Sequence, residues 1–276
     1  MRQKQHCMES KKMCTEQSIP VAGKGKIISS KQIQESVYLV ETELNEEFQN
    51  LPNPGQFYML KTVPSDVYLS RPISVYRSYK TATGSVRVEF LILKKGRGTE
   101  ELCTARSETA IKIIGPLGNG FTKQDSCERK TALVGGGIGV APVAGFARSL
   151  ADGSYDFYAC FKHGSYGLDY IKPESVFIST DDGSCGVKGM LPSIFSEKDA
   201  AEYAAVYACG PEPMLKYVQK TCKTAGVPCF LSLEARMACG LGACLGCTVK
   251  TTAGNKRCCK DGPVFSGDEI VFGERK

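Results

Sequence analysis

The chain has 276 residues, of which 42% are hydrophobic, and carries a formal net charge of +6. This length predicts two or three domains with buried cores, and no run of about 18 apolar residues is present that would span a membrane. The lysines and arginines are scattered and form no stripe with aromatic residues, which argues against nucleic-acid binding.

Residues 1–24 are polar, lysine-rich and aperiodic, which predicts a flexible tail. They contain no apolar segment of signal-peptide length, so export is not expected. Fourteen cysteines in a chain that is not exported fit a reducing cytoplasm.

Residues 25–124 are predicted to form an antiparallel β-barrel domain of about six strands, because short β-branched and aromatic segments alternate with turn signals. The strands are expected at residues 27–33, 37–43, 57–60, 73–76, 86–93 and 111–114.

Two segments of this region have groups that suit binding of a phosphate. Arg71-Pro72-Ile73-Ser74 offers a forked donor and a hydroxyl. Lys95-Gly96-Arg97-Gly98-Thr99 is a glycine turn in which Thr99 is expected to cap a short helix.

Residues 125–233 alternate strands with helices, which predicts a parallel sheet covered on both faces. Strands are expected at residues 132–134, 155–161, 176–179, 205–208 and 230–233, and helices at 142–150, 191–196 and 213–225. The first strand leads into Gly135-Gly136-Gly137-Ile138-Gly139, whose backbone N–H groups suit a dinucleotide pyrophosphate. The strict G-x-G-x-x-G spacing is missing, so a plain tight turn is the alternative.

Asp181 and the pair Cys209-Gly210 follow two other strands of this sheet. Because ligands of parallel sheets bind outside the carboxyl ends of the strands, we expect these residues along one edge with residues 135–139. A carboxylate at position 181 accepts hydrogen bonds from a ribose and repels a 2′-phosphate, which favours NAD over NADP. Lys188 is near enough in sequence to offset that acid, and a solvated turn is the alternative for Asp181.

Residues 234–276 hold Cys239, Cys244 and Cys247 in C-x4-C-x2-C spacing, followed by Cys258 and Cys259. This is the ligand spacing of a plant-type 2Fe–2S cluster, in which four thiolates hold two irons. A zinc site usually pairs two C-x2-C knuckles, and disulfides need an oxidising compartment. Neighbouring residues of an extended chain point to opposite sides, so only one of the last two cysteines is expected to face the cluster. Small residues that suit a backbone wrapped around sulfides stand between the ligands, at Gly240, Gly242, Ala243 and Gly246.

In this order the motifs resemble the ferredoxin–NADP reductase superfamily. Over residues 25–276 they are more closely similar to the electron-transfer subunits of NAD-linked (class 1B) dihydroorotate dehydrogenases. The resemblance implies that Arg71 binds the FAD pyrophosphate and that Ser74 lies near the flavin ring. The fourth ligand of the family directly precedes x-Asp-Gly-Pro, which selects Cys259 here. The implied FAD residues are Arg71, Pro72, Ile73, Ser74, Leu91, Ile92, Leu93, Gly98 and Thr99, and the implied cluster ligands are Cys239, Cys244, Cys247 and Cys259.

The resemblance also implies a function. A hydride passes between NAD and FAD, and the cluster relays single electrons to an FMN-containing catalytic subunit that oxidises dihydroorotate to orotate in a heterotetramer. Cys209 is expected to shape the nicotinamide pocket, and no side chain of this chain is expected to be catalytic, since no serine or cysteine is paired with a histidine base.

Rival interpretations share the same motifs. Related flavin and iron–sulfur subunits serve sulfide dehydrogenases, transhydrogenases, sulfite reductases and hydrogenases. Some of these resemble the cluster pattern with aspartate at its first position. The cysteine at position 239 therefore favours the dihydroorotate dehydrogenases, which serve pyrimidine biosynthesis. A non-enzymatic iron–sulfur redox sensor is the alternative of another class, and residues 71–74 argue against it.

Overall fold

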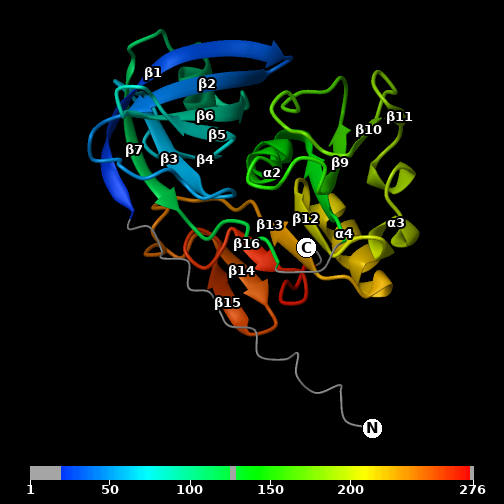
Figure 1. Ribbon diagram of the computed structural model, residues 1–276. Coiled ribbons are helices and arrows are strands. Elements are labelled where there is room, and N and C mark those ends of the chain that lie inside the picture. The colour runs from blue at the N-terminus through cyan, green and yellow to red at the C-terminus, as the bar shows by residue number, and fades with distance from the viewer. Residues whose placement is uncertain (1–19, 125–128, 274–276) are drawn as a thin grey trace.

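The computed structural model describes residues 20–124 and 129–273, which form two seven-stranded sheets and a small C-terminal segment (Figure 1). The predicted tail lies outside the described residues up to residue 19. Strand β1 begins at Val21. No helix in the described ranges combines the length and apolar character needed to cross a bilayer.

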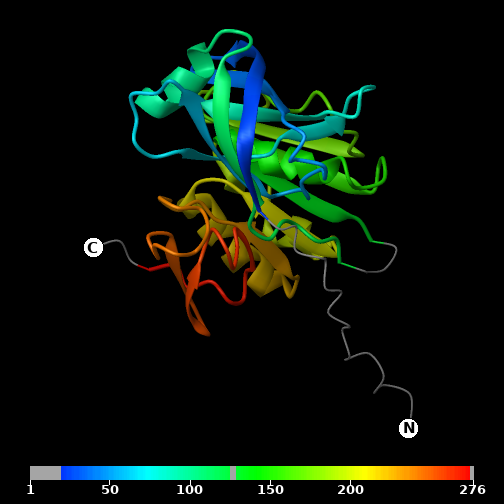
Figure 2. The same ribbon diagram turned by 90° about the vertical axis from the view of Figure 1, so that its left-hand side faces the viewer.

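The first sheet is antiparallel throughout and has the strand order β4-β3-β7-β1-β2-β6-β5. It curls into a half-barrel (Figure 2), which confirms the predicted barrel architecture. Along β6, Val86, Val88, Phe90 and Ile92 all point into the same buried cluster, as the two-residue period of a half-buried strand requires. The elements are β1 (Val21–Gln34), β2 (Val37–Leu44), β3 (Phe57–Val63), β4 (Arg71–Ser74), β5 (Arg77–Lys80), β6 (Val86–Leu93), α1 (Arg97–Thr104) and β7 (Ala110–Leu117).

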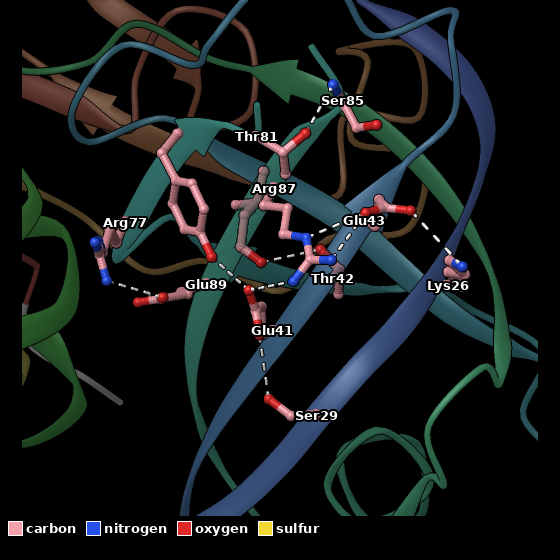
Figure 3. A network of polar contacts seen from close by, with 12 residues as sticks. Lys26, Ser29, Glu41, Thr42, Glu43, Arg77, Thr81, Ser85, Arg87 and Glu89 are labelled. Carbon is pink, nitrogen blue, oxygen red and sulfur yellow. Dashed lines mark hydrogen bonds and ion pairs between the residues drawn. The ribbon is translucent and has the colours of Figure 1, made fainter. Parts of the chain in front are cut away.

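Strand β5 was not expected from the sequence, because its residues Arg77–Lys80 are polar. It pairs with β6 as an edge strand and joins a ladder of charged side chains on the outer face (Figure 3). Arg87 on β6 donates to Glu41 and to Glu43 on β2, each at 3.0 Å, and Arg77 pairs with Glu89 at 3.1 Å. Cross-strand ion pairs of this kind contribute about 1 kcal/mol or less each, so they favour the register more than they stabilise the fold.

The second sheet has the order β11-β10-β9-β8-β12-β13-β16 and is parallel except for the pair β13–β16. Helix α2 packs on one face and helices α3 and α4 on the other, as predicted. The elements are β8 (Thr131–Gly136), α2 (Val140–Ala147), β9 (Tyr155–Phe161), β10 (Ser175–Thr180), β11 (Val187–Lys188), α3 (Glu197–Ala201), β12 (Ala205–Cys209), α4 (Glu212–Ala225), β13 (Cys229–Ser232) and β16 (Val264–Ser266).

Helix α2 lies between the two sheets. All of its residues except Gly145 are buried, and a Cβ at Gly145 would stand 3.1 Å from the carbonyl oxygen of Tyr76 in the first domain. Tyr76 and Leu91 share a buried cluster with α2, so the two sheets are joined by one continuous apolar contact.

The prediction of a single helix at residues 191–196 is wrong. One 3-10 turn, Leu191–Ser193, is followed by a separate helix that Ser196 caps. The Ser196 Oγ accepts from Asp199 N at 3.4 Å, and an Asp199 carboxylate oxygen accepts from Ser196 N at 2.8 Å. This reciprocal cap starts a new element where the apolar pattern alone indicated a single helix.

The C-terminal segment lies below the first sheet and beside the β13 edge of the second sheet (Figures 1 and 2). It contains the hairpin β14 (Thr248–Thr251) and β15 (Gly254–Arg257), and then returns as β16 to pair with β13. The cysteine-bearing segment is therefore joined to the second sheet by strand pairing.

Candidate functional site

A pocket of about 640 Å³ opens between β4 and the start of α1. The structure brings together here the two segments that the sequence indicated separately as phosphate sites. The guanidinium of Arg71 lies directly against Gly98, where any Cβ would collide with its Nε atom. Arg71, Lys95 and Arg97 line the pocket with a single carboxylate, that of Asp66, so the pocket favours an anion.

The sequence predicted Thr99 as the cap of this helix, but the N-cap of α1 is Gly96. Thr99 is the third helical residue, and its Oγ1 accepts from Lys95 N at 2.9 Å and from Gly96 N at 3.1 Å. The N–H groups of Arg97 and Gly98, the first two helical residues, have no acceptor within the helix. Together with the Arg71 fork, these donors fit a phosphate group.

Strand β4 carries Arg71, Pro72, Ile73 and Ser74, which are all half-buried. Three residues of extended chain span roughly 10 Å, so β4 offers Arg71 to a phosphate and Ser74 to a group farther along the same strand. Leu91 and Ile92 on β6 are buried in two different apolar clusters. A contact of Leu91, Ile92 and Leu93 with FAD stays a prediction.

At the carboxyl edge of the second sheet, β8 and β12 end side by side and their loops touch. The space that a Cβ would need at Gly139 is filled by the Cys209 carbonyl, and a Cβ at Gly210 would stand 3.0 Å from the Gly136 Cα. Gly137 has a φ of +54°, which favours glycine. Since β8 stands between β9 and β12, the strand order reverses here, and such a switch point is where open α/β sheets bind ligands.

Asp181 follows β10, two strands away from β8. It shares the edge with the glycine loop but does not lie beside it. Asp182 is engaged within its own turn, because its Oδ1 accepts from Ser184 N at 2.9 Å and from Ser184 Oγ at 2.6 Å, and these bonds lower the pKa of Asp182. This leaves Asp181 as the carboxylate that could meet a ribose. The stem of Lys188 lies along the same turn, 3.1 Å from a Cβ placed at Gly183, so the turn carries a lysine as well as its two carboxylates.

Cys209 is only 3% exposed, and burial raises the pKa of its thiol. A buried thiol of raised pKa is a poor nucleophile. The geometry therefore fits the expected role of Cys209 as a wall of the pocket.

The thiols of the C-terminal segment gather in two pairs. Cys247 Sγ and Cys259 Sγ stand 3.2 Å apart and both residues are 2% exposed, while Cys239 Sγ accepts the backbone N–H of Cys244 at 3.5 Å and is hydrogen-bonded to the Cys244 side chain. Among the described residues, no three His, Cys, Asp or Glu side chains converge as a single metal ion would require. Two thiol pairs suit the two irons of a 2Fe–2S cluster and do not suit tetrahedral zinc.

The two adjacent cysteines point in different directions. Cys259 N donates to Cys247 Sγ at 3.4 Å, whereas Cys258 Sγ donates to the Leu233 carbonyl at 3.2 Å on the other side. Burial acts to raise the pKa of the Cys239 thiol, but the backbone N–H groups of Cys244 and nearby residues outweigh it and lower the pKa to about 6. This loop thus favours the thiolate form that binds metal.

The cysteine loop packs on the first sheet. Gly240 has a φ of +72°, and a Cβ there would stand 2.7 Å from Met59 Cγ and 3.1 Å from Leu117 Cδ1. Met59 pairs with Pro72 across β3 and β4. The loop therefore packs on β3, and the Arg71–Ser74 strand β4 is the next strand of the sheet. Neighbouring strands lie about 4.8 Å apart. No local motif marks Met59 or Leu117, and sequence reasoning did not single them out for this contact.

Comparison with known proteins gives the same assignment. Residues 234–271 match the family model of the iron-sulfur cluster binding domain of dihydroorotate dehydrogenase B. The chain is 40% identical over 251 residues to the electron transfer subunit of dihydroorotate dehydrogenase B (NAD(+)) from Clostridium acetobutylicum, and the match covers 90% of this chain and 97% of the relative. The protein of the same description from Clostridium perfringens is 42% identical over 255 residues, covering 90% and 98%.

Solved structures show the same fold. The NADH-dependent reduced ferredoxin-NADP oxidoreductase studied for flavin-based electron bifurcation superposes with a TM-score of 0.70 at 24% identity, covering 90% of this chain and 89% of that one. Phthalate dioxygenase reductase superposes with a TM-score of 0.56 at 15% identity, covering 84% and 87%. The family resemblance and the multi-domain fold predicted from the sequence are confirmed.

Proposed function

The chain belongs to the family of dihydroorotate dehydrogenase B electron transfer subunits, and on this premise we propose that it carries electrons between NAD and a catalytic partner subunit through FAD and a 2Fe–2S cluster. One observation carries the proposal. The anion pocket lies at Arg71 on β4, and the cysteine loop at Gly240 packs against Met59 on β3, the neighbouring strand of the same sheet. A flavin site and an iron–sulfur site placed in this way suit electron transfer between the two groups.

We assign the FAD site to β4, β6 and the start of α1. The Arg71 guanidinium and the backbone N–H groups of Arg97 and Gly98 would bind the pyrophosphate, and Ser74 would meet the flavin ring. When bound, FAD accepts a hydride from NADH and passes electrons on one at a time. The remaining residues proposed to contact FAD are Pro72, Ile73, Leu91, Ile92, Leu93 and Thr99.

We assign the NAD site to the carboxyl edge of the second sheet. The glycine loop would hold the pyrophosphate on its N–H groups, Asp181 would accept from the ribose, and Cys209 and Gly210 would shape the nicotinamide pocket. The loop residues are Gly135, Gly136, Gly137 and Gly139. The residues of this chain would bind NAD and orient its nicotinamide ring, and none of them is assigned as an acid, base or nucleophile.

We assign the cluster ligands to Cys239, Cys244, Cys247 and Cys259. The corresponding division of the chain is an FAD domain up to residue 124, an NAD domain at 125–233 and a cluster domain at 234–276. The boundary predicted between residues 24 and 25 moves to Val21, because residues 21–24 pair with β7 as part of β1. The pairing of β16 with β13 means that the last two regions share a sheet. A cytoplasmic location fits a chain with so many free thiols.

The proposed partner is the FMN-containing catalytic subunit that oxidises dihydroorotate to orotate, in a heterotetramer. We place its docking face over the cysteine loop. Leu241 is 49% exposed and Leu245 60% exposed, on either side of the exposed Cys244. Large apolar side chains left in water beside a cluster ligand suit an interface at which electrons leave the subunit.

We expect Leu245→Glu to weaken binding of the catalytic subunit by about 100-fold, because a carboxylate would be buried without a partner in the interface. The matched control is Val187→Glu, at a side chain that is 49% exposed on β11, at the far edge of the second sheet (Figure 1). Binding is measured by titrating the purified catalytic subunit and following the mass of the complex by light scattering. Equal affinity of Leu245→Glu and the wild type would place the docking face elsewhere.

The function is tested by isolating the complex without air and recording its visible spectrum before and after each reductant. Both dihydroorotate and NADH are expected to bleach the flavin and cluster bands. If NADH bleaches them and dihydroorotate does not, with the catalytic subunit shown to be present, the dihydroorotate assignment is wrong and a sulfide, hydrogenase or transhydrogenase partner is indicated. If NADH leaves the bands unchanged, the electron-transfer proposal itself is refuted.

A further inference from the structure

Asn119 ties the first sheet to the turn that follows Cys259. It stands after β7, and hydrogen bonds connect it to this turn through both its backbone and its side chain. Asn119 N donates to the Gly262 carbonyl at 2.6 Å, and its own carbonyl accepts from Val264 N at 3.4 Å. The Asn119 Nδ2 donates to the Lys260 carbonyl at 3.3 Å and to the Asp261 carbonyl at 3.1 Å.

The turn that Asn119 holds is already closed from within. Asp261 Oδ2 accepts from Arg257 N at 2.7 Å and from Arg257 Nε at 3.0 Å, and Asp261 N donates to the Arg257 carbonyl at 2.8 Å. Residues 257–261, which include Cys259, therefore form one hydrogen-bonded unit. What these bonds do not fix is where that unit stands relative to the flavin-binding sheet.

Backbone packing beside Asn119 leaves little freedom. Gly118 has a φ of +74°, and a Cβ there would stand 2.5 Å from Pro263 Cδ and 2.7 Å from the Gly262 carbonyl oxygen. The Gly118 carbonyl in turn accepts from Gln56 Nε2 at 2.8 Å, which fastens it to the loop before β3. The first sheet and the cysteine-bearing turn thus approach at backbone distance at this point.

The chemistry of position 119 suits a primary amide. An asparagine Nδ2 carries two hydrogens and reaches two carbonyls, while an aspartate of the same shape has no donor and would repel both oxygens. One of these carbonyls belongs to Lys260, the residue directly after Cys259. The Cys259 thiol in turn pairs with Cys247 at 3.2 Å.

We propose that Asn119 is a positioning residue for electron transfer: by binding the carbonyls of Lys260 and Asp261, it sets where the Cys247–Cys259 thiol pair stands relative to the flavin site on β4. The inference rests on the proposed function, because it presupposes a flavin and a cluster. Electron transfer between two fixed groups slows as they move apart, so a turn that is held less firmly slows the transfer.

The test compares Asn119→Ala and Asn119→Asp with Asn255→Ala, a change at an exposed asparagine of β15 in the same segment. The first measurement is hydrogen exchange of the backbone amides of residues 260–262 and 264 in the chain without cofactors. The second is rapid mixing of the reconstituted protein with NADH, which follows flavin reduction and cluster reduction separately. Asn119→Ala removes the donors without adding a charge, so it keeps the test decisive if Asn119→Asp, whose carboxylate would repel both carbonyls, does not fold.

Both Asn119 variants are expected to exchange about tenfold faster at residues 260–262 and 264, since about two hydrogen bonds to this turn are lost. Flavin reduction by NADH stays at the wild-type rate, and the cluster is reduced more slowly than in the wild type in both variants. Asn255→Ala matches the wild type in every measurement.

Faster exchange with unchanged cluster reduction would overturn the proposal, since Asn119 would then be structural only. Unchanged exchange together with unchanged transfer would also overturn it. A wild-type flavin that NADH does not reduce would refute the proposed function instead. The exchange data, which need no cofactor, would still report separately whether Asn119 holds the turn.

Discussion

Replacing Cys259 with serine is expected to remove the cluster, whereas Cys258→Ser is expected to leave it in place. The two residues are neighbours of the same type and are both buried, so they form a matched pair. Cys259 Sγ stands 3.2 Å from Cys247 Sγ, while Cys258 Sγ points to the Leu233 carbonyl. A serine hydroxyl is a harder and poorer iron ligand than a thiolate, but it can still donate to the Leu233 carbonyl.

Iron and acid-labile sulfide are measured on protein purified without air, together with the electron paramagnetic resonance signal of the dithionite-reduced form. Iron is expected to fall from about two per chain to near zero in Cys259→Ser and to stay at the wild-type level in Cys258→Ser. NADH should still reduce the flavin in Cys259→Ser, while electrons no longer reach the partner. Iron loss in Cys258→Ser with retention in Cys259→Ser would reverse the assignment of the fourth ligand.

Arg71→Ala is expected to weaken FAD binding by about 100-fold or more. The guanidinium lies in the anion pocket against Gly98, and charge-assisted hydrogen bonds from an arginine fork to a phosphate contribute about 1.5–3 kcal/mol each. Gly98→Val is expected to act in the same direction without removing a charge, because its side chain would occupy the place of the Arg71 Nε atom.

The control for this pair is Arg106→Ala, at an exposed arginine beyond the end of α1 that does not line the pocket. The ratio of FAD to protein after gel filtration and the dissociation constant from flavin fluorescence give the comparison. If Arg71→Ala keeps FAD as tightly as Arg106→Ala, the pocket between β4 and α1 is not the pyrophosphate site.

Features that depend on neighbours in sequence could be predicted from the chain alone. The C-x4-C-x2-C spacing covers nine residues and indicates the cluster by itself, because the ligands and their glycines lie on one loop. The alternation of apolar residues along β6 and the glycine loop after β8 are equally local. Errors arose where two local signals competed, as at Thr99, which is the third residue of α1 and not its cap, and at Ser196, which starts a new helix.

Only the tertiary structure decided which distant segments meet. Arg71 and Gly98 were separate candidates until the curl of the first sheet brought them into one pocket. Cysteine spacing alone left Cys258 and Cys259 equivalent, and only the family resemblance selected Cys259. The fold directs the Cys259 thiol to Cys247 and the Cys258 thiol to Leu233. Met59 carries no motif, and Asn119 stands in the glycine-rich run 115–121, which does not reveal its partner, yet they contact Gly240 and Asp261. Such contacts follow from the order and twist of whole sheets, which depend on burial summed over the entire chain, and no short window of sequence contains that sum.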